Sequence, residues 1–165
     1  MKISLTTFLS ALTVLVSPIF YCGATTSDAA ADICSNYDDG FLKAYLARDD
    51  YAGAASYAAQ TGASLEKCAR GASSSAELMF LQTAAELYAS AGDAVIKWSP
   101  SRIDLITKDY TASIRLYNEL LALAATQTKT HWFGFNNDQL QYFETEITID
   151  RDKLAQFALN AKQQP

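Results

Sequence analysis

The chain has a single histidine, His131, and only three cysteines and three prolines among its 165 residues. One histidine excludes every metal centre and catalytic mechanism that needs two. The chain also lacks the glycine-rich phosphate loop, the Gly-x-Ser-x-Gly turn, the Cys-x-x-Cys-His haem attachment and the paired-histidine zinc helix. We therefore expect no cofactor and no metal, and we assign no catalytic residue.

Positive charge is also scarce. The 13 lysines and arginines are outnumbered by 18 aspartates and glutamates, so the net charge is −5 at pH 7. A mildly acidic chain without a basic cluster is a poor ligand for nucleic acid or for an anionic membrane surface. The composition therefore favours neither partner.

The first 24 residues have the order of a secretory signal peptide. Lys2 is the only charge before Asp28, and an apolar run over Ile3–Val16 follows it. Small residues close the segment at 22–24. A basic start, an apolar middle and a small-residue end are what the export machinery reads. We expect cleavage after Ala24, no membrane span in the remaining chain, and a periplasmic or secreted protein.

Three alternatives at this end stay open. Cleavage could follow Ala31, because Ala29 and Ala31 also have the required spacing. Acylation of Cys22 would give a lipid anchor, although Tyr21 stands where a small residue is usual. The apolar stretch is also close to the ~20 residues that cross a bilayer, so an uncleaved anchor is the third alternative.

Removal of Cys22 would leave Cys34 and Cys68. Two cysteines in an exported chain most simply form one disulfide. The chain-entropy model gives such a bond about 3–4 kcal/mol of stabilisation. Two buried thiols are the alternative, and the spacing does not fit a zinc site.

Beyond a disordered lead-in at 25–31, residues 32–165 are expected to form one all-α domain of five to seven helices, arranged as antiparallel hairpins. Alanine is frequent, and proline occurs only at Pro100 and Pro165. Apolar residues recur at helical spacing, as in the stripe of Tyr110, Ile114 and Tyr117. No segment has the alternation of a strand.

Local signals set the expected helix ends. We predict helices over about 32–48, from Asp50 to the region of Cys68, from Ser74 to a glycine cap at Gly92, from Ser99-Pro100 to about 126–130, and over about 138–162. Thr61-Gly62 could interrupt the second helix, and β-branched residues could break the last one near Asp150. A hairpin folded near residue 49 would also bring position 34 close to position 68.

Several turns resemble those of the tetratricopeptide family. Ala44-Tyr45 is followed by Asp50-Tyr51-x-x-Ala54, Tyr88 is followed by Gly92-Asp93, and Asp109-Tyr110 precedes Tyr117. In that family, small residues and aromatics pack two antiparallel helices. The resemblance covers about half of the chain after residue 24, and it implies stacked hairpins with a concave peptide-binding surface.

The segment 131–137 is the one unusual stretch of the chain. It combines His131 with the aromatic residues Trp132, Phe133 and Phe135. Exposed, these four residues would form a contact for another molecule, because Trp and Phe anchor interfaces and histidine can make binding pH-dependent. Alternatively, the segment is a hydrophobic plug that folds back on the helices, with Asn137 capping the last helix.

The sequence thus predicts an exported helical module that binds a protein or peptide in the cell envelope or outside the cell. A small-ligand carrier is an alternative, and it should contain an apolar pocket of several hundred Å³. An enzyme with an unrecognised site is the other alternative, and it should place His131 or a carboxylate in a cleft with a shifted pKa.

Overall fold

The computed structural model describes residues 34, 37–70, 74–127 and 135–163. Within this part of the chain there are five helices and no strand, which confirms the all-α prediction. The helices are α2 (Gly40–Leu46), α3 (Tyr51–Ala69), α4 (Ser74–Trp98), α5 (Ile103–Gln127) and α6 (Asn137–Gln163). The predicted signal peptide and lead-in lie outside the described residues. Across those residues, no helix combines the length and the apolar character needed to cross a bilayer.

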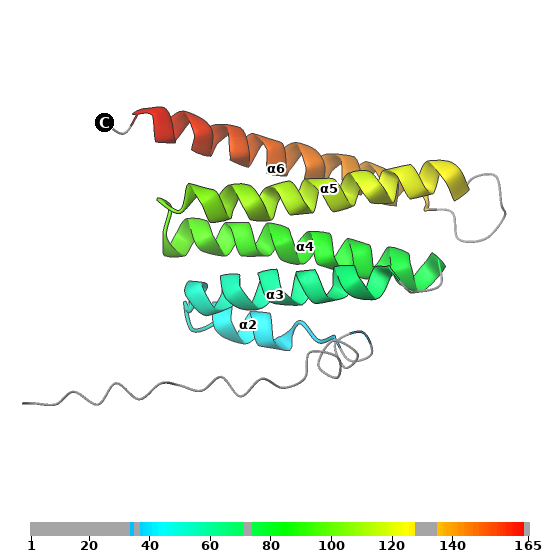
Figure 1. Ribbon diagram of the computed structural model, residues 1–165, viewed down its shortest axis with the longest axis horizontal. Helices are drawn as coiled ribbons and strands as arrows, with labels where there is room; N and C mark the ends of the chain where they lie inside the picture. The colour runs from blue at the N-terminus through cyan, green and yellow to red at the C-terminus, as the bar shows by residue number, and fades with distance from the viewer. Residues whose placement is uncertain (1–33, 35–36, 71–73, 128–134, 164–165) are drawn as a thin grey trace, which may run out of the picture.

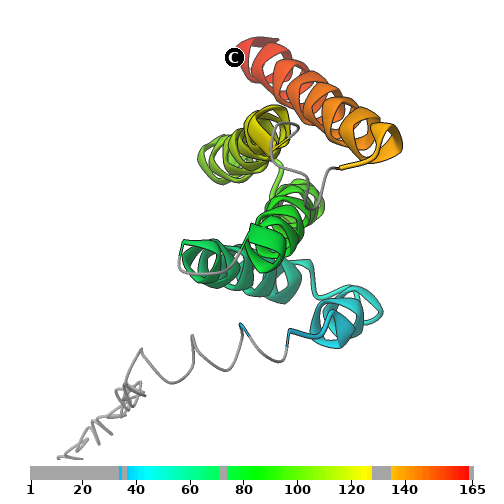
Figure 2. The same cartoon turned by 90° about the vertical axis from the view of Figure 1, so that its right-hand side faces the viewer.

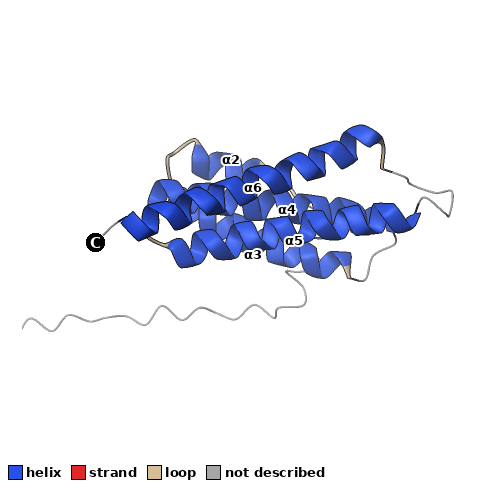
Figure 3. Cartoon of the chain, turned by 90° about the horizontal axis from the view of Figure 1, so that it is seen from above, coloured by secondary structure: helices blue, strands red, loops and turns tan. Residues whose placement is uncertain are grey.

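The helices form an open array in chain order. Figure 1 shows α2 to α6 side by side, each packed against the helix before it. Seen nearly end on, they follow a zigzag, with α3 and α5 on one side of the array and α2 and α6 on the other (Figure 2). Figure 3 shows that all of them run roughly along one axis. The predicted antiparallel hairpins are therefore present, and α2 and α6 stand at opposite ends.

Small residues bring the middle helices together. Ala54 and Ala58 of α3 and Ala84 and Ala91 of α4 are completely buried. Alanine favours helix and keeps the backbones close. Larger side chains fill the interface of α5 with α6, where the rings of Tyr117 and Phe143 lie 5.7 Å apart. The core is thus narrow between α3 and α4 and aromatic toward α6.

The predicted first helix, 32–48, is wrong in its middle. Residues 37–39 are not helical, and α2 begins at Gly40. The carboxylate of Asp38 accepts a hydrogen bond from the Gly40 N–H at 3.0 Å. Such a local bond from an aspartate competes with the helical backbone, which explains the interruption.

The predicted helix end at Gly92 is also wrong, since α4 continues to Trp98. Gly92 is buried inside the helix, and a Cβ atom there would lie 3.0 Å from the ring of Tyr110. The glycine therefore makes room for an aromatic ring of α5 instead of ending α4.

The second and last helices are both uninterrupted. α3 passes through Thr61-Gly62, and α6 passes through its β-branched stretch, where Ile147 is buried. Packing against a neighbouring helix outweighs the weak propensity of these residues. At the start of α6, the Asn136 side chain accepts from Gln139 N at 2.8 Å and the Gln139 side chain accepts from Asn136 N at 3.1 Å. The capping residue is thus Asn136, one position before the expected Asn137.

Candidate functional site

The predicted pairing of Cys34 with Cys68 is confirmed. The two residues form a disulfide, with their Cα atoms 5.8 Å apart. Cys68 lies in the last turn of α3, so the bond ties this end of α3 to the segment that precedes α2. The bond has a structural role, because it fixes the first hairpin.

Of the four predicted contact residues, only Phe135 is among the described residues. It is half-buried, and its ring meets that of Phe143 edge-on at 5.1 Å. Phe143 in turn contacts Tyr142 of the same helix, with ring centroids 5.9 Å apart. His131, Trp132 and Phe133 lie outside the described residues, so their role in binding stays a prediction.

Glu86 of α4 is the centre of a polar cluster that joins three parts of the chain. Its Oε1 atom accepts hydrogen bonds from Gln82 Nε2 at 3.0 Å and from Tyr142 Oη of α6 at 3.3 Å. Tyr37, in the segment that precedes α2, lies close enough to Glu86 for the charge of that carboxylate to act on it. Burial, Tyr57 and the carboxylates of Asp39 and Glu86 together raise the pKa of Tyr37 to about 12. Tyr37, Glu86 and Tyr142 therefore occupy one surface.

Aromatic side chains lie on this part of the molecule as well. Phe41 is 65% exposed and Tyr142 is 38% exposed. The rings of Phe41 and Tyr45 lie 5.9 and 6.0 Å from that of Tyr57, whose hydroxyl donates to the Asp38 carbonyl at 3.3 Å. We call the combined surface of α2 and the segment before it, α3, α4 and α6 the acidic–aromatic surface. It comprises Tyr37, Asp38, Phe41, Tyr57, Glu86, Tyr142 and Glu146.

The charge of this surface is negative. Lys43 of α2 is paired with Asp39, and Lys153 of α6 is paired with Asp93 at 2.7 Å. Within the described residues, Asp38, Glu86 and Glu146 form no ion pair, and the one cation on which Asp38 acts, Lys43, is bound to Asp39. Half-exposed aromatic rings beside carboxylates that lack cations can bind a positively charged segment, because the rings cover its aliphatic stems and the carboxylates pair with its head groups.

A second polar cluster lies where α4, α5 and α6 meet, with Asp93 at its exposed edge. The Asp93 Oδ1 atom accepts from Tyr110 Oη and from Lys153 Nζ, and Lys153 also lies 5.1 Å from the centre of the Tyr110 ring. Asp150 of α6 and Ser113 of α5 are completely buried beside it. Burial raises the pKa of Asp150 to about 6, while the nearby Ser113 hydroxyl and Lys153 ammonium act in the opposite direction.

Asp109 of α5 is a further buried carboxyl group. Its burial raises its pKa to about 6, and Lys108 opposes that shift. Asp109 and Asp150 both lie in helix interfaces, where no reactant reaches them. Their shifted pKa values therefore have a packing origin and do not supply the cleft carboxylate that the enzyme alternative expects.

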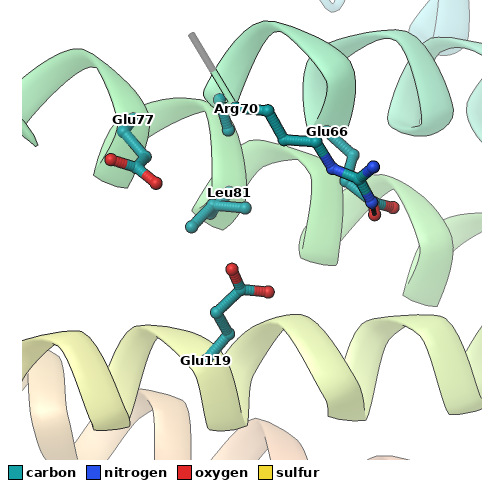
Figure 4. Close-up of a pocket in the computed structure, with 6 residues that line it drawn as sticks. Glu66, Arg70, Glu77, Leu81 and Glu119 are labelled. Carbon is teal, nitrogen blue, oxygen red and sulfur yellow. Dashed lines mark hydrogen bonds and ion pairs between the residues drawn. The ribbon is translucent and has the colours of Figure 1, made fainter. Parts of the chain in front are cut away.

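A small polar pocket lies between α3, α4 and α5 (Figure 4). Glu66, Arg70, Glu77, Leu81, Glu119 and Ala69 line it. Glu66 accepts from Arg70 at 3.1 Å and from Arg115 at 2.8 Å, which links α3 to α5. The volume of this pocket is about 50 Å³, which is enough for a few water molecules and far below the size of an organic ligand site. It is not the apolar pocket that a small-ligand carrier requires.

The sequence analysis missed Glu86, Tyr142 and Asp150. Asp150 carried a usable signal, since it continues the buried helical stripe of Phe143 and Ile147 at the next turn. Glu86 and Tyr142 carried none, because they are 56 residues apart and only the packing of α6 beside α4 brings them together.

No family model matches the chain, and neither a curated protein nor a solved structure matches it. The resemblance to tetratricopeptide hairpins stays a prediction.

Proposed function

We propose that this protein is an exported binding module that takes a protein or peptide partner on its acidic–aromatic surface. One observation carries the proposal. The half-exposed Tyr142 donates to Glu86, a carboxylate with no cationic partner among the described residues, and the exposed Phe41 packs on Tyr57, whose hydroxyl donates to Asp38. Tyrosine-rich surfaces supply large contact area at low entropic cost, which suits them to protein recognition.

The charge of the surface defines the partner. The carboxylates of Asp38, Glu86 and Glu146, which form no ion pair in the described part of the chain, favour a segment rich in lysine or arginine. The net charge of −5 adds a long-range attraction for such a segment. We therefore expect a cationic contact surface on the partner and an association rate that falls as salt is added.

The aromatic segment 131–135 extends this surface in our proposal. Phe135 contacts Phe143, which contacts Tyr142, so the end of the segment lies two ring contacts from the centre of the surface. Trp132 and Phe133 are thereby candidates for a second contact with the same partner.

Export is supported by the signal-like residues 1–24 and by the paired cysteines. A disulfide persists in oxidising compartments and is rare where thiols are kept reduced. The bond between Cys34 and Cys68 therefore fits a protein that works in the cell envelope or outside the cell.

Crosslinked co-purification of the tagged protein from its own host, read by mass spectrometry, tests the proposal. Three forms are compared: the wild type, the double variant Glu86→Gln with Tyr142→Ala, and Glu119→Gln, which changes a carboxylate of the separate polar pocket. We expect a stoichiometric partner with the wild type and with Glu119→Gln, and its loss with the double variant. Absence of any partner, or a partner that the double variant retains, would contradict the proposal.

A further inference from the structure

The last helix is held to the array in an unusual way. α6 packs on α5 through Phe143 and Ile147, and it reaches α4 through the hydrogen bond of Tyr142 and the ion pair of Lys153. No described helix follows it (Figure 1). Its release would therefore leave the packing of α2 to α5 intact.

Within the interface of α6 with α5, a carboxyl group is buried with only partial compensation. Asp150 is fully buried, and neither of its carboxylate oxygens has a hydrogen-bond partner among the described residues. The Ser113 hydroxyl, buried nearby on α5, makes no hydrogen bond either, although it lies close enough to Asp150 to favour the ionised carboxylate. A buried charge without partners costs several kcal/mol, whereas a protonated carboxyl group is far less costly to bury.

Burial, and not the net effect of the neighbouring groups, disfavours the ionised form of Asp150, because Lys153 and the Ser113 hydroxyl act against Glu146 and Asp93. From α4 it faces Asp93, from α5 it faces Tyr110 and Ser113, and from α6 itself it faces Glu146 and Lys153. Lys153 is the only cation among them, and its ammonium group is already bound to Asp93. The surroundings therefore offer Asp150 two further carboxylates and a cation that is engaged elsewhere.

We propose that α6 is a proton-dependent latch, in which protonation of Asp150 seats α6 against α4 and α5 and ionisation of Asp150 releases it.

The direction follows from proton linkage. The pKa of Asp150 is about 6 with α6 seated, above the value of about 3.9 for an exposed aspartate. The seated state thus binds the proton more tightly than the open state. Seating is strongest below about pH 4 and weakens as the pH rises through 6. Between pH 4.5 and pH 7.5 the opening equilibrium of α6 should increase on the order of tenfold or more.

The far half of α6 is suited to such release. After Asp150 the helix is mostly exposed, and Leu159 is 60% exposed. Few apolar contacts hold this half, so its local opening costs less than unfolding of the whole chain.

If the proposed function holds, the latch also regulates it, because Tyr142 and Glu146 of α6 are part of the acidic–aromatic surface. The latch itself does not depend on that function, and its test uses no partner.

Amide hydrogen exchange of the full-length protein at pH 4.5 and pH 7.5 measures the opening directly, once the intrinsic pH dependence of exchange is divided out. We expect protection of α6 to fall at least tenfold toward pH 7.5, while protection of α3 and α4 changes less. In Asp150→Asn, which is neutral and of the same size, α6 should stay protected at both values. Asp152→Asn, the same change at an exposed position two residues on, should behave as the wild type.

Ser113→Ala gives an independent readout if Asp150→Asn does not fold. The serine hydroxyl opposes the pKa shift of Asp150, so its removal should move the midpoint of α6 opening to higher pH. Equal protection of α6 at both pH values in the wild type would overturn the latch. The same pH response in Asp150→Asn as in the wild type, or opening of all helices together, would overturn it as well.

Discussion

The hydroxyl of Tyr142 donates a hydrogen bond to the carboxylate of Glu86 at 3.3 Å, across 56 residues of sequence. This contact joins the last helix to α4, two helices before it in the chain. It also marks the place where the carboxylates and aromatic rings of the proposed binding surface meet.

Replacement of this pair should weaken partner binding with little effect on folding. Tyr142→Phe removes only the hydroxyl, and Glu86→Gln removes only the charge. At this partly exposed site the hydrogen bond contributes about 0.5–1.5 kcal/mol to stability. We expect Glu86→Gln to reduce the affinity for an octalysine peptide at least threefold at low salt, measured by isothermal titration calorimetry. The control is Glu119→Gln, and an equal loss in that variant would show that only net charge matters.

Loss of the disulfide should destabilise the protein strongly. The bond closes a loop with a sequence separation of 34, for which the chain-entropy model gives about 3–4 kcal/mol. The double variant Cys34→Ser with Cys68→Ser should therefore unfold at a lower urea concentration. Its free energy of unfolding should be smaller by that amount. Thiol titration of the unfolded, non-reduced mature protein checks the pairing itself, and two titratable thiols there would rule the bond out.

Gly92→Ala should destabilise the protein by about 1–3 kcal/mol, because the added Cβ atom meets the buried Tyr110 ring at 3.0 Å. That ring has little freedom to move, since its hydroxyl is bound to Asp93. Gly62→Ala is the matched control, with its nearest contact at 3.4 Å from the Ala84 carbonyl oxygen. There the better helix propensity of alanine should leave stability unchanged or slightly higher. Thermal unfolding compares the two, and an equal response would contradict the tight fit at Gly92.

The free energy of unfolding should decrease as the pH rises from about 4 to about 7. Asp109 and Asp150 have pKa values of about 6 in the folded protein, above about 3.9 in an unfolded chain. The folded state therefore binds more protons in this window, and stability is lost with rising pH, on the order of 1–3 kcal/mol for each group. The pKa of Asp104 is lowered, so this group stabilises the folded protein as the pH rises. Its effect on stability lies below the range of pH 4 to 7.

Urea unfolding at several pH values measures this slope. Asp109→Asn should reduce the slope for the whole protein and leave the local opening of α6 unchanged, whereas Asp150→Asn should reduce both. Stability that instead increases between pH 4 and pH 7 would contradict this prediction.

Trp132→Ala tests the aromatic segment. If Trp132 contacts the partner, the variant should lose binding in the co-purification experiment and keep its melting temperature. A fall in melting temperature of several degrees would indicate the hydrophobic plug instead, because removal of a buried Trp costs about 3–5 kcal/mol.

The number of helices, their α-helical character and the pairing of the cysteines could be predicted from the sequence. Each of them depends on residues close in sequence or on a simple hairpin. The Asp50 side chain, expected as a cap, accepts from Gly53 N at 2.9 Å at the start of α3. Local signals failed where a distant group decides the outcome. Gly92 has the appearance of a helix end, yet the ring of Tyr110 explains it.

The all-α class, the antiparallel hairpins and the pairing of Cys34 with Cys68 could all be inferred from the amino-acid sequence. Periodic apolar residues, caps and one turn near residue 49 are sufficient for this, since all act within one or two helices. The contact of Glu86 with Tyr142 and the burial of Asp150 against α5 become visible only once the helices are packed. These relationships depend on how α6 lies across α4 and α5, and that packing is the sum of many weak contacts between distant segments, which no local pattern encodes.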